Sequence, residues 1–223
     1  MNELLIADDH PLFREALRGL VGKHYPSANI YEAENTDSLF ALVDAHAEAD
    51  LLLLDLNMPG AEGYSSLVFL RSHHPQLPIA IISALEDPVL MRRAVDHGAM
   101  GYIPKSADTD MLCEAIDQIL MGNIWLPKNA QSTPAVSSKE KEAAKLVSQL
   151  TPQQLRVLQK VTSGQLNKQI AYDLGVSETT IKTHMTAILR KLGVNNRTQA
   201  VLLAYELELQ NKTEQELLDF LDE

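Results

Sequence analysis

Four consecutive leucines occupy residues 51–54, between Asp50 and Asp55. A strand with one face in water alternates polar and apolar residues, so a run without alternation is typical of a parallel strand buried on both faces. Strands are predicted at residues 3–7, 29–32, 50–55, 79–83 and 100–104, and the segments between them are long enough for crossover helices, the first at residues 11–21. Residues 1–122 therefore predict an α/β domain with a doubly wound, five-stranded parallel sheet.

The charge is divided unevenly along the chain. The net charge is -11 overall; residues 1–122 carry 7 Lys or Arg against 19 Asp or Glu, whereas residues 151–210 carry 7 against 4. Residues 123–150 contain prolines followed by a charged stretch, which predicts a linker with a helix in its second half. We expect an acidic first domain, this linker, a mildly basic second domain over residues 151–210, and an acidic extension over residues 211–223.

The sequence favours a cytoplasmic protein. The apolar run of residues 4–7 is too short for a signal peptide, and no segment approaches the roughly 20 apolar residues of a membrane helix. Cys113 is the single cysteine, which excludes an internal disulfide, and its place in an amphipathic pattern predicts a core position.

The second domain contains four short helices with recognisable ends. Cap residues and glycines predict them after Thr151, from Asn167, after Ser177 and after Asn196. The second and third helices, joined by a turn at residues 175–177, have the spacing of a helix-turn-helix. On the third helix one face is apolar (Ile181, Met185, Ile188, Leu189, Leu192) and the other is polar (Thr179, Lys182, Thr183, Thr186, Arg190). The polar face is predicted to enter the DNA major groove.

Polar residues stand at the carboxyl ends of the predicted strands of the first domain. Asp8 and Asp9 follow the first strand, Asp55 ends the third, Ser83 ends the fourth and Lys105 follows the fifth. Ligands of open parallel sheets bind at this edge. Converging carboxylates require a cation, and hard oxygen ligands suit Mg²⁺, while a hydroxyl and an ammonium suit a phosphoryl group. The sequence therefore predicts a site for both.

The segments "IADDH", "LLLLDLNMPGAEG", "IISA" and "GYIPKS" resemble the signature segments of CheY-like receiver domains, which have a flavodoxin-like fold. The resemblance implies that Asp55 accepts a phosphoryl group and that Mg²⁺ is held by Asp55, Asp8, Asp9 and the carbonyl of Asn57. It further implies that Ser83 and Lys105 bind the phosphoryl oxygens and that Tyr102 reorients on activation. Pro104 precedes Lys105 and Ser106 stands where many receivers have proline, which leaves open which nearby peptide bond, if any, is cis.

Residues 150–201 resemble the DNA-binding domain of LuxR-type regulators, the NarL family, and read LTPQQLRVLQKVTSGQLNKQIAYDLGVSETTIKTHMTAILRKLGVNNRTQAV. The resemblance implies base contacts by Lys182, Thr183 and Thr186, and phosphate contacts by Lys168, Thr179, Arg190 and Lys191. Gln154 stands where Glu is usual in the family, which puts any ion pair in doubt but keeps a capping box with Thr151.

Together the two resemblances imply a DNA-binding transcriptional response regulator, phosphorylated on Asp55 by a sensor histidine kinase. Phosphorylation is expected to shift a closed form, in which the receiver covers the recognition helix, toward a homodimer on promoter DNA. The stripe Val201, Leu202, Tyr205 and Leu209 is the predicted dimer face.

The expected chemistry is limited to phosphotransfer and dephosphorylation at the receiver itself, so no enzyme of external substrates is predicted. One alternative is a Mg²⁺-dependent phosphatase with Asp55 as nucleophile, but Asn57 stands where its general acid would be needed. Another is a constitutive regulator whose receiver serves only as a dimerisation scaffold.

Overall fold

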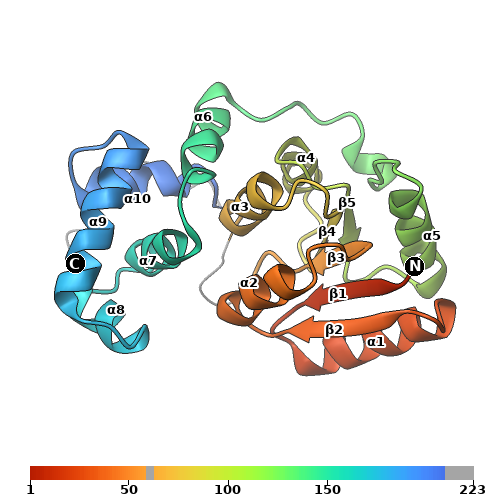
Figure 1. Ribbon diagram of the computed structural model, residues 1–223. Helices are drawn as coiled ribbons and strands as arrows, with labels where there is room; N and C mark the ends of the chain where they lie inside the picture. Colours follow the sequence, from red (N-terminus) through yellow and green to blue (C-terminus); the bar gives the residue numbers. More distant parts are fainter. Residues whose placement is uncertain (59–62, 209–223) are drawn as a thin grey trace. The chain divides into compact units, whose positions relative to one another are not determined.

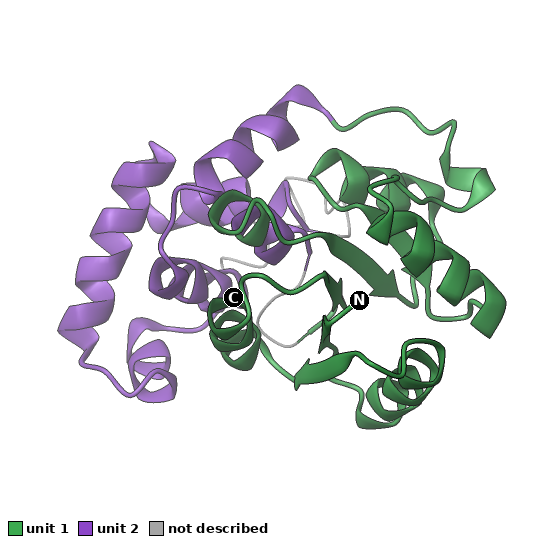
Figure 2. Cartoon of the chain, turned by 45° about the vertical axis from the view of Figure 1, so that its right-hand side comes forward, with its two compact units in different colours: residues 1–61, 70–136 green, residues 62–69, 137–223 purple. Residues whose placement is uncertain are grey.

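The computed structural model describes residues 1–58 and 63–208 and contains two compact units (Figure 2). The first comprises residues 1–61 and 70–136, and the second residues 62–69 and 137–223. The acidic extension predicted at residues 211–223 lies outside the described residues.

The first unit is built on a parallel sheet (Figure 1). Its strands are β1 (Glu3–Ala7), β2 (Asn29–Ala33), β3 (Leu51–Leu54), β4 (Ile79–Ser83) and β5 (Gly101–Pro104). They pair in the order β2-β1-β3-β4-β5, and all four pairings are parallel. The predicted five-stranded, doubly wound sheet is confirmed. The order in which strands are added switches from one side of β1 to the other, so the switch point lies between β1 and β3.

Helices flank this sheet: α1 (Pro11–His24), α2 (Thr36–Ala45), α4 (Pro88–Asp96) and α5 (Thr109–Leu120). A further helix, α3 (Ser65–His73), spans the boundary between the units. Helices α1 and α5 bury Leu17 and Ile116 against Leu4 and Leu53 of the sheet in the main apolar cluster. Because successive residues of a strand point to opposite faces, Leu52 and Leu54 lie on the other face. All four leucines of β3 are at most 1% exposed, as their lack of alternation predicts.

The chain after α5 stays with the first unit. The Trp125 nitrogen donates to the Met100 carbonyl at 2.9 Å, and the Tyr102 nitrogen donates to the Trp125 carbonyl at 3.1 Å, beside β5. A short 3₁₀ helix, η1 (Lys128–Ala130), packs on α4, and the Val136 nitrogen donates to Asp96 Oδ2 at 3.0 Å. The first half of the predicted linker is therefore attached to the first unit up to Val136.

Besides the first residues of α3, the described part of the second unit contains five helices: α6 (Ser138–Val147), α7 (Pro152–Thr162), α8 (Asn167–Asp173), α9 (Glu178–Leu192) and α10 (Arg197–Tyr205). Helix α6 is the helix expected in the second half of the linker. Thr151 and Gln154 form the predicted capping box of α7, Ser177 caps α9, and Gly193 ends α9 with a left-handed φ of 68°. Helices α7, α8 and α10 pack on α9 around a core that includes Leu155, Ile170, Ile181, Ile188 and Ala200.

One expectation is corrected, and one question that the sequence left open is answered. Cys113 is half-buried, so the predicted core position is corrected; its side chain lies on the flank of α5. Every peptide bond among the described residues is trans, including those around Lys105. None of the helices that the structure describes combines the length and the apolar character needed to cross a bilayer.

Candidate functional site

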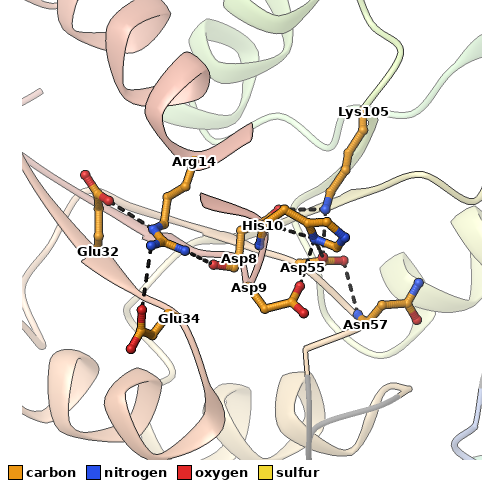
Figure 3. Close-up of polar contacts among 9 residues, drawn as sticks. All are labelled: Asp8, Asp9, His10, Arg14, Glu32, Glu34, Asp55, Asn57 and Lys105. Carbon is orange, nitrogen blue, oxygen red and sulfur yellow. Dashed lines mark hydrogen bonds and ion pairs between the residues drawn. The ribbon is translucent and has the colours of Figure 1, made fainter. Parts of the chain in front are cut away.

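Three carboxylates meet at the carboxyl ends of β1 and β3, the point where the strand order reverses (Figure 3). Asp8 is fully buried, Asp55 is 2% exposed, and the Asp9 side chain is 25% exposed. The Asp55 nitrogen donates to the Ala7 carbonyl at 2.8 Å, which holds the ends of the two strands together. The sheet topology therefore brings Asp55 to the adjacent pair Asp8 and Asp9, more than forty residues earlier in the sequence, as predicted.

Lys105 reaches these carboxylates from the end of β5. Its Nζ lies 2.7 Å from both Asp55 Oδ2 and Asp8 Oδ2, and its side chain is 14% exposed. The Lys105 nitrogen donates to the Ser83 carbonyl at 2.7 Å, and Nζ lies 4.8 Å from the centre of the Phe13 ring. One ammonium thus neutralises part of the charge of two carboxylates.

The environment shifts the pKa values of the central pair. Burial raises the pKa of Asp55, and the neighbouring Asp8 adds to this, while the Lys105 ammonium and the Asn57 backbone nitrogen act in the opposite direction. Burial alone would lower the pKa of Lys105, but Asp55 and Asp8 outweigh it and raise the pKa. An ionised Asp55 in this pocket is thus short of positive charge, which favours binding of a cation.

His10 belongs to the cluster, although the site residues predicted from the sequence do not include it. Its Nδ1 lies 2.8 Å from Asp9 Oδ1, 3.2 Å from Asp8 Oδ1 and 3.9 Å from Asp55 Oδ2. Its backbone nitrogen donates to Asp8 Oδ1 at 2.8 Å, so the turn after β1 folds the imidazole back over the acids. The position of His10 directly after two aspartates was the sequence signal that could have placed it in the site. The direction of its imidazole ring, however, depends on the conformation of this turn.

Arg14, on the first turns of α1, supports the same loop from outside. Its Nη1 donates to the Asp8 carbonyl at 2.6 Å, and its Nε pairs with Glu32 Oε2 at 3.0 Å (Figure 3). Glu34 lies at 3.8 Å from Nη2. The guanidinium therefore links the Asp8 loop to β2, a role that no sequence pattern indicated.

The residues present fit a divalent cation. Oxygens of Asp8, Asp9 and Asp55, together with a His10 nitrogen, all lie within 4.8 Å of one another, a spacing that one ion can bridge. The buried oxygens Asp8 Oδ2 and Asp9 Oδ1 meet Lys105 and His10 but accept no well-aligned hydrogen bond from the described residues. Asn57 lies two residues after Asp55 in the sequence, and its backbone nitrogen donates to Asp55 Oδ1 at 3.1 Å.

Ser83 and Tyr102 lie next to this pocket and are both fully buried. Ser83 Oγ accepts from the Leu85 nitrogen at 3.3 Å, and the Tyr102 hydroxyl donates to the Leu85 carbonyl at 2.6 Å. Burial raises the pKa of Tyr102 to about 12, with a smaller opposing effect of the Ser83 hydroxyl. Tyr102 therefore points inward and holds the loop after β4.

In the second unit, α9 presents the polar face that the sequence predicts. Five of the seven residues assigned to DNA are exposed on α9, namely Thr179, Lys182, Thr183, Thr186 and Arg190, and Lys168 is exposed on α8. The Thr183 and Thr186 hydroxyls donate to carbonyls one turn earlier, at 3.1 and 3.0 Å. Lys182 pairs with Glu178 at 2.9 Å.

Lys191 has a different environment from Arg190. Its Nζ donates to the Gln149 carbonyl and to Gln154 Oε1, both at 2.8 Å, and the residue is half-buried. Gln154 Oε1 also accepts from the Thr151 nitrogen at 3.1 Å. The glutamine at the position that is usually Glu thus keeps both the capping box and a contact with Lys191, without an ion pair.

The predicted dimer stripe on the last helix is wrong for Val201. Val201 is fully buried in α10, which packs on α7 and α9, and so it is unavailable to a partner. The Tyr205 hydroxyl lies 3.4 Å from the Thr162 carbonyl, Leu202 is half-buried, and Leu209 lies outside the described residues.

A parallel sheet with a cluster of carboxylates paired with a lysine at its switch point, followed along the chain by a helix-turn-helix, defines a DNA-binding regulator with a receiver domain. Residues 4–117 match the response regulator receiver domain, and residues 148–204 match the bacterial regulatory proteins of the luxR family. The chain belongs to the response regulator family, in the branch with a LuxR-type DNA-binding domain.

Similar proteins agree with this assignment. The chain is 42% identical over 214 residues to the glycerol metabolism activator of Pseudomonas putida, covering 93% of this chain and 97% of that relative. It is 30% identical over 205 residues to the nitrate/nitrite response regulator NarL of Escherichia coli K12, covering 91% and 94%. A LuxR family DNA-binding response regulator from Silicibacter pomeroyi has a similar structure, with a TM-score of 0.51 and 34% identity, covering 57% of this chain and 98% of that one.

Proposed function

We propose that a sensor histidine kinase phosphorylates this regulator on Asp55, and that the phosphorylated form dimerises and binds promoter DNA. The observation that carries the proposal is the buried pair of Asp55 and Asp8 bridged by Lys105 Nζ at 2.7 Å from each. A carboxylate held in this way has a fixed nucleophilic oxygen, and the ammonium that fixes it is placed for the oxygens of an incoming phosphoryl group.

The proposed reaction is a transfer between two side chains. An Asp55 oxygen forms a bond to phosphorus as the bond between phosphorus and the kinase imidazole breaks, and the imidazole nitrogen leaves with that electron pair. Asp8, Asp9, Asp55 and the Asn57 carbonyl would hold Mg²⁺, which supplies positive charge to the transferring group. Lys105 and the Ser83 hydroxyl bind the phosphoryl oxygens, and Tyr102 reorients with the loop that Leu85 belongs to.

The proposal also includes the DNA side. Lys182, Thr183 and Thr186 read bases, while Lys168, Thr179 and Arg190 lie nearer phosphates, and two copies bind two half-sites. In the unphosphorylated form the acidic receiver masks the basic recognition helix, in keeping with the opposite net charges of the two sequence regions. No turnover of an external substrate is expected, since Asn57 occupies the position where a phosphatase of this kind needs an acid.

Binding to a pool of random DNA sequences tests the proposal, with and without a small phosphodonor plus Mg²⁺. We expect tighter binding with the donor, together with one added phosphoryl group by intact mass. Both effects should be lost in Asp55→Asn and retained in the control Asp110→Asn, whose exposed side chain lies on α5. Phosphorylation that survives in Asp55→Asn contradicts the site, whereas phosphorylation without any change in DNA binding favours the scaffold alternative.

A further inference from the structure

Ser106, the residue after Lys105, has a side-chain partner that the proposed chemistry does not use. Its Oγ donates to Glu86 Oε1 at 2.5 Å, across twenty residues of the chain. Glu86 stands three residues after Ser83, and Ser83 and Pro104 are the last residues that pair between β4 and β5. The bond therefore joins the two segments that follow β4 and β5, beyond the end of the sheet.

Two further bonds connect the same parts of the chain. The Lys105 nitrogen donates to the Ser83 carbonyl at 2.7 Å, and the buried Tyr102 hydroxyl donates to the Leu85 carbonyl at 2.6 Å. Ser83 and Lys105 are the residues whose side chains are proposed to bind the phosphoryl oxygens. The bond beyond the sheet is thus a third link between the segments that carry these two side chains.

Glu86 and Ser106 are both exposed, and an exposed hydrogen bond between two free loops would contribute little. Here both loops are held independently. Asp87, the residue after Glu86, caps α4 with its side chain. The Ala107 nitrogen donates to the Pro104 carbonyl at 3.0 Å and closes a turn around Ser106. Because both segments are already ordered, little backbone entropy is lost when the bond forms.

A phosphoryl group on Asp55 would have to meet the Ser83 hydroxyl and the Lys105 ammonium at the same time. These two groups come from different strands, so their separation depends on the segments after β4 and β5 staying together. A displacement of about 1 Å in a reacting arrangement can cost on the order of a hundredfold in rate. A link between the two segments therefore bears directly on the transfer.

We propose that Ser106 and Glu86 form a clamp that positions Lys105 and Ser83 for the phosphoryl group. The inference rests on the proposed function, because it concerns the same transfer to Asp55. Ser106 acts through the neighbouring Lys105, and Glu86 acts through the segment that begins at Ser83. Both are positioning residues, and neither touches the phosphoryl group.

Phosphorylation of the full chain by acetyl phosphate and Mg²⁺, followed over time by intact mass, tests the clamp. We expect Ser106→Ala to slow phosphorylation roughly threefold to tenfold, the range that one hydrogen bond contributes. The Mg²⁺ concentration that gives the half-maximal rate should stay the same, because the proposed cation ligands follow β1 and β3. Ser106→Thr keeps the hydroxyl and should retain the wild-type rate.

The pairing itself is tested in a Glu86→Ala background. There Ser106→Ala should have no further effect, because its partner is already gone. The matched control is Ser27→Ala, which removes an exposed serine hydroxyl just before β2, at the amino end of the sheet. This control should phosphorylate at the wild-type rate.

A wild-type rate in Ser106→Ala, or an equal loss with and without Glu86, would overturn this inference and leave the proposed function intact. A Mg²⁺ requirement that changes together with the rate would also overturn it, because the substitution would then disturb the whole site. Absence of phosphorylation in folded wild type would instead overturn the proposed function itself.

Discussion

The carbonyl of Trp125 accepts a hydrogen bond at 3.1 Å from the backbone nitrogen of Tyr102, whose hydroxyl donates to Leu85. Tyr102 therefore connects the loop after β4, next to the carboxylate cluster, with the chain that leaves the receiver. The edge of β5 is covered at this point, which removes unpaired backbone groups from solvent. Trp125 is the only tryptophan in the sequence, so its fluorescence reports on this contact.

Gly101→Ala is expected to disturb the covered edge of β5. A Cβ at Gly101 would lie 2.7 Å from Ile119 Cδ1 and 3.0 Å from the Trp125 carbonyl oxygen, so the buried Ile119 side chain must shift and the Trp125 backbone must give way slightly. Such overpacking costs typically about 1–3 kcal/mol of the free energy of unfolding. Urea unfolding followed by tryptophan fluorescence measures this loss, together with a change in the native emission.

The matched control is Gly19→Ala, an exposed position in α1 where a Cβ meets no atom within 4 Å. Because alanine is the better helix former, this variant should gain roughly 0.5–1 kcal/mol. Equal effects of the two substitutions would contradict the close packing at Gly101.

Tyr102→Phe is expected to change the dependence of stability on alkaline pH. Burial raises the pKa of Tyr102 to about 12, so between pH 10 and 12 the folded state holds a proton that the unfolded state has released. The contribution of the protonated Tyr102 hydroxyl to the free energy of unfolding is therefore complete below pH 10. It decreases as pH rises, by on the order of 2 kcal/mol at pH 12. The variant lacks this loss.

Urea unfolding of wild type and Tyr102→Phe at pH 8 and pH 11.5 measures the difference. At pH 8 the variant should be less stable by about 1 kcal/mol, because the bond to the Leu85 carbonyl is lost. At pH 11.5 the difference should shrink or change sign. A constant difference at both pH values would show that the Tyr102 hydroxyl does not titrate with folding.

The sheet and the pocket could be predicted because they depend on patterns in the sequence. The unbroken leucines of β3 require burial on both faces, and polar residues that follow parallel strands meet at one edge of the sheet. Asp8, Asp9, Asp55 and Lys105 are therefore found together in the structure. The recognition helix was predictable for the same reason, since Ser177 and Gly193 mark its ends and its apolar face repeats with the helical period.

Contacts that depend on the path of a loop were not predictable. His10 joins the acids because its own backbone nitrogen bonds to Asp8, and Arg14 reaches the Asp8 carbonyl from the next helix. The composition around Trp125 resembles that of a free linker, but backbone hydrogen bonds, which carry no sequence signature, attach it to β5. Val201 was assigned to an outer stripe because periodicity alone does not say which neighbouring helices cover a face.

Asp96→Ala is expected to release the end of the attached segment. Asp96 Oδ2 accepts from the Val136 nitrogen at 3.0 Å, and Oδ1 pairs with Arg92 at 3.0 Å. Loss of this acceptor should speed hydrogen exchange at Val136 and increase cleavage by a protease between η1 and α6, because local opening needs fewer broken contacts. The control Asp110→Ala removes an exposed α5 carboxylate and should leave both measurements unchanged. Unaltered exchange at Val136 in Asp96→Ala would contradict the attachment.

Gln154→Glu is expected to stabilise the DNA-binding unit. The Lys191 ammonium already lies 2.8 Å from Gln154 Oε1, and a carboxylate in that position makes the bond charge-assisted while it keeps the capping box. We expect a gain of about 1 kcal/mol in urea unfolding at pH 7, which disappears in a Lys191→Met background. Gln153→Glu places the same charge in the first turn of α7, away from Lys191. An equal gain from Gln153→Glu would assign the effect to the helix N-terminus instead.

Arg190→Gln and Lys191→Met are expected to differ in their effect on DNA binding, although the two residues are neighbours. Arg190 is exposed and available to a phosphate, whereas Lys191 is bonded to Gln149 and Gln154 within the unit. Each phosphate contact contributes about 0.9 to the slope of log affinity against log salt concentration, because a bound counterion is released. Arg190→Gln should therefore reduce the slope by about 0.9. Lys191→Met should leave the slope unchanged and lower the stability of the unit by about 1–3 kcal/mol. If Lys191→Met instead reduces the slope by a full contact, Lys191 leaves Gln154 on binding and contacts DNA, as the family resemblance implies.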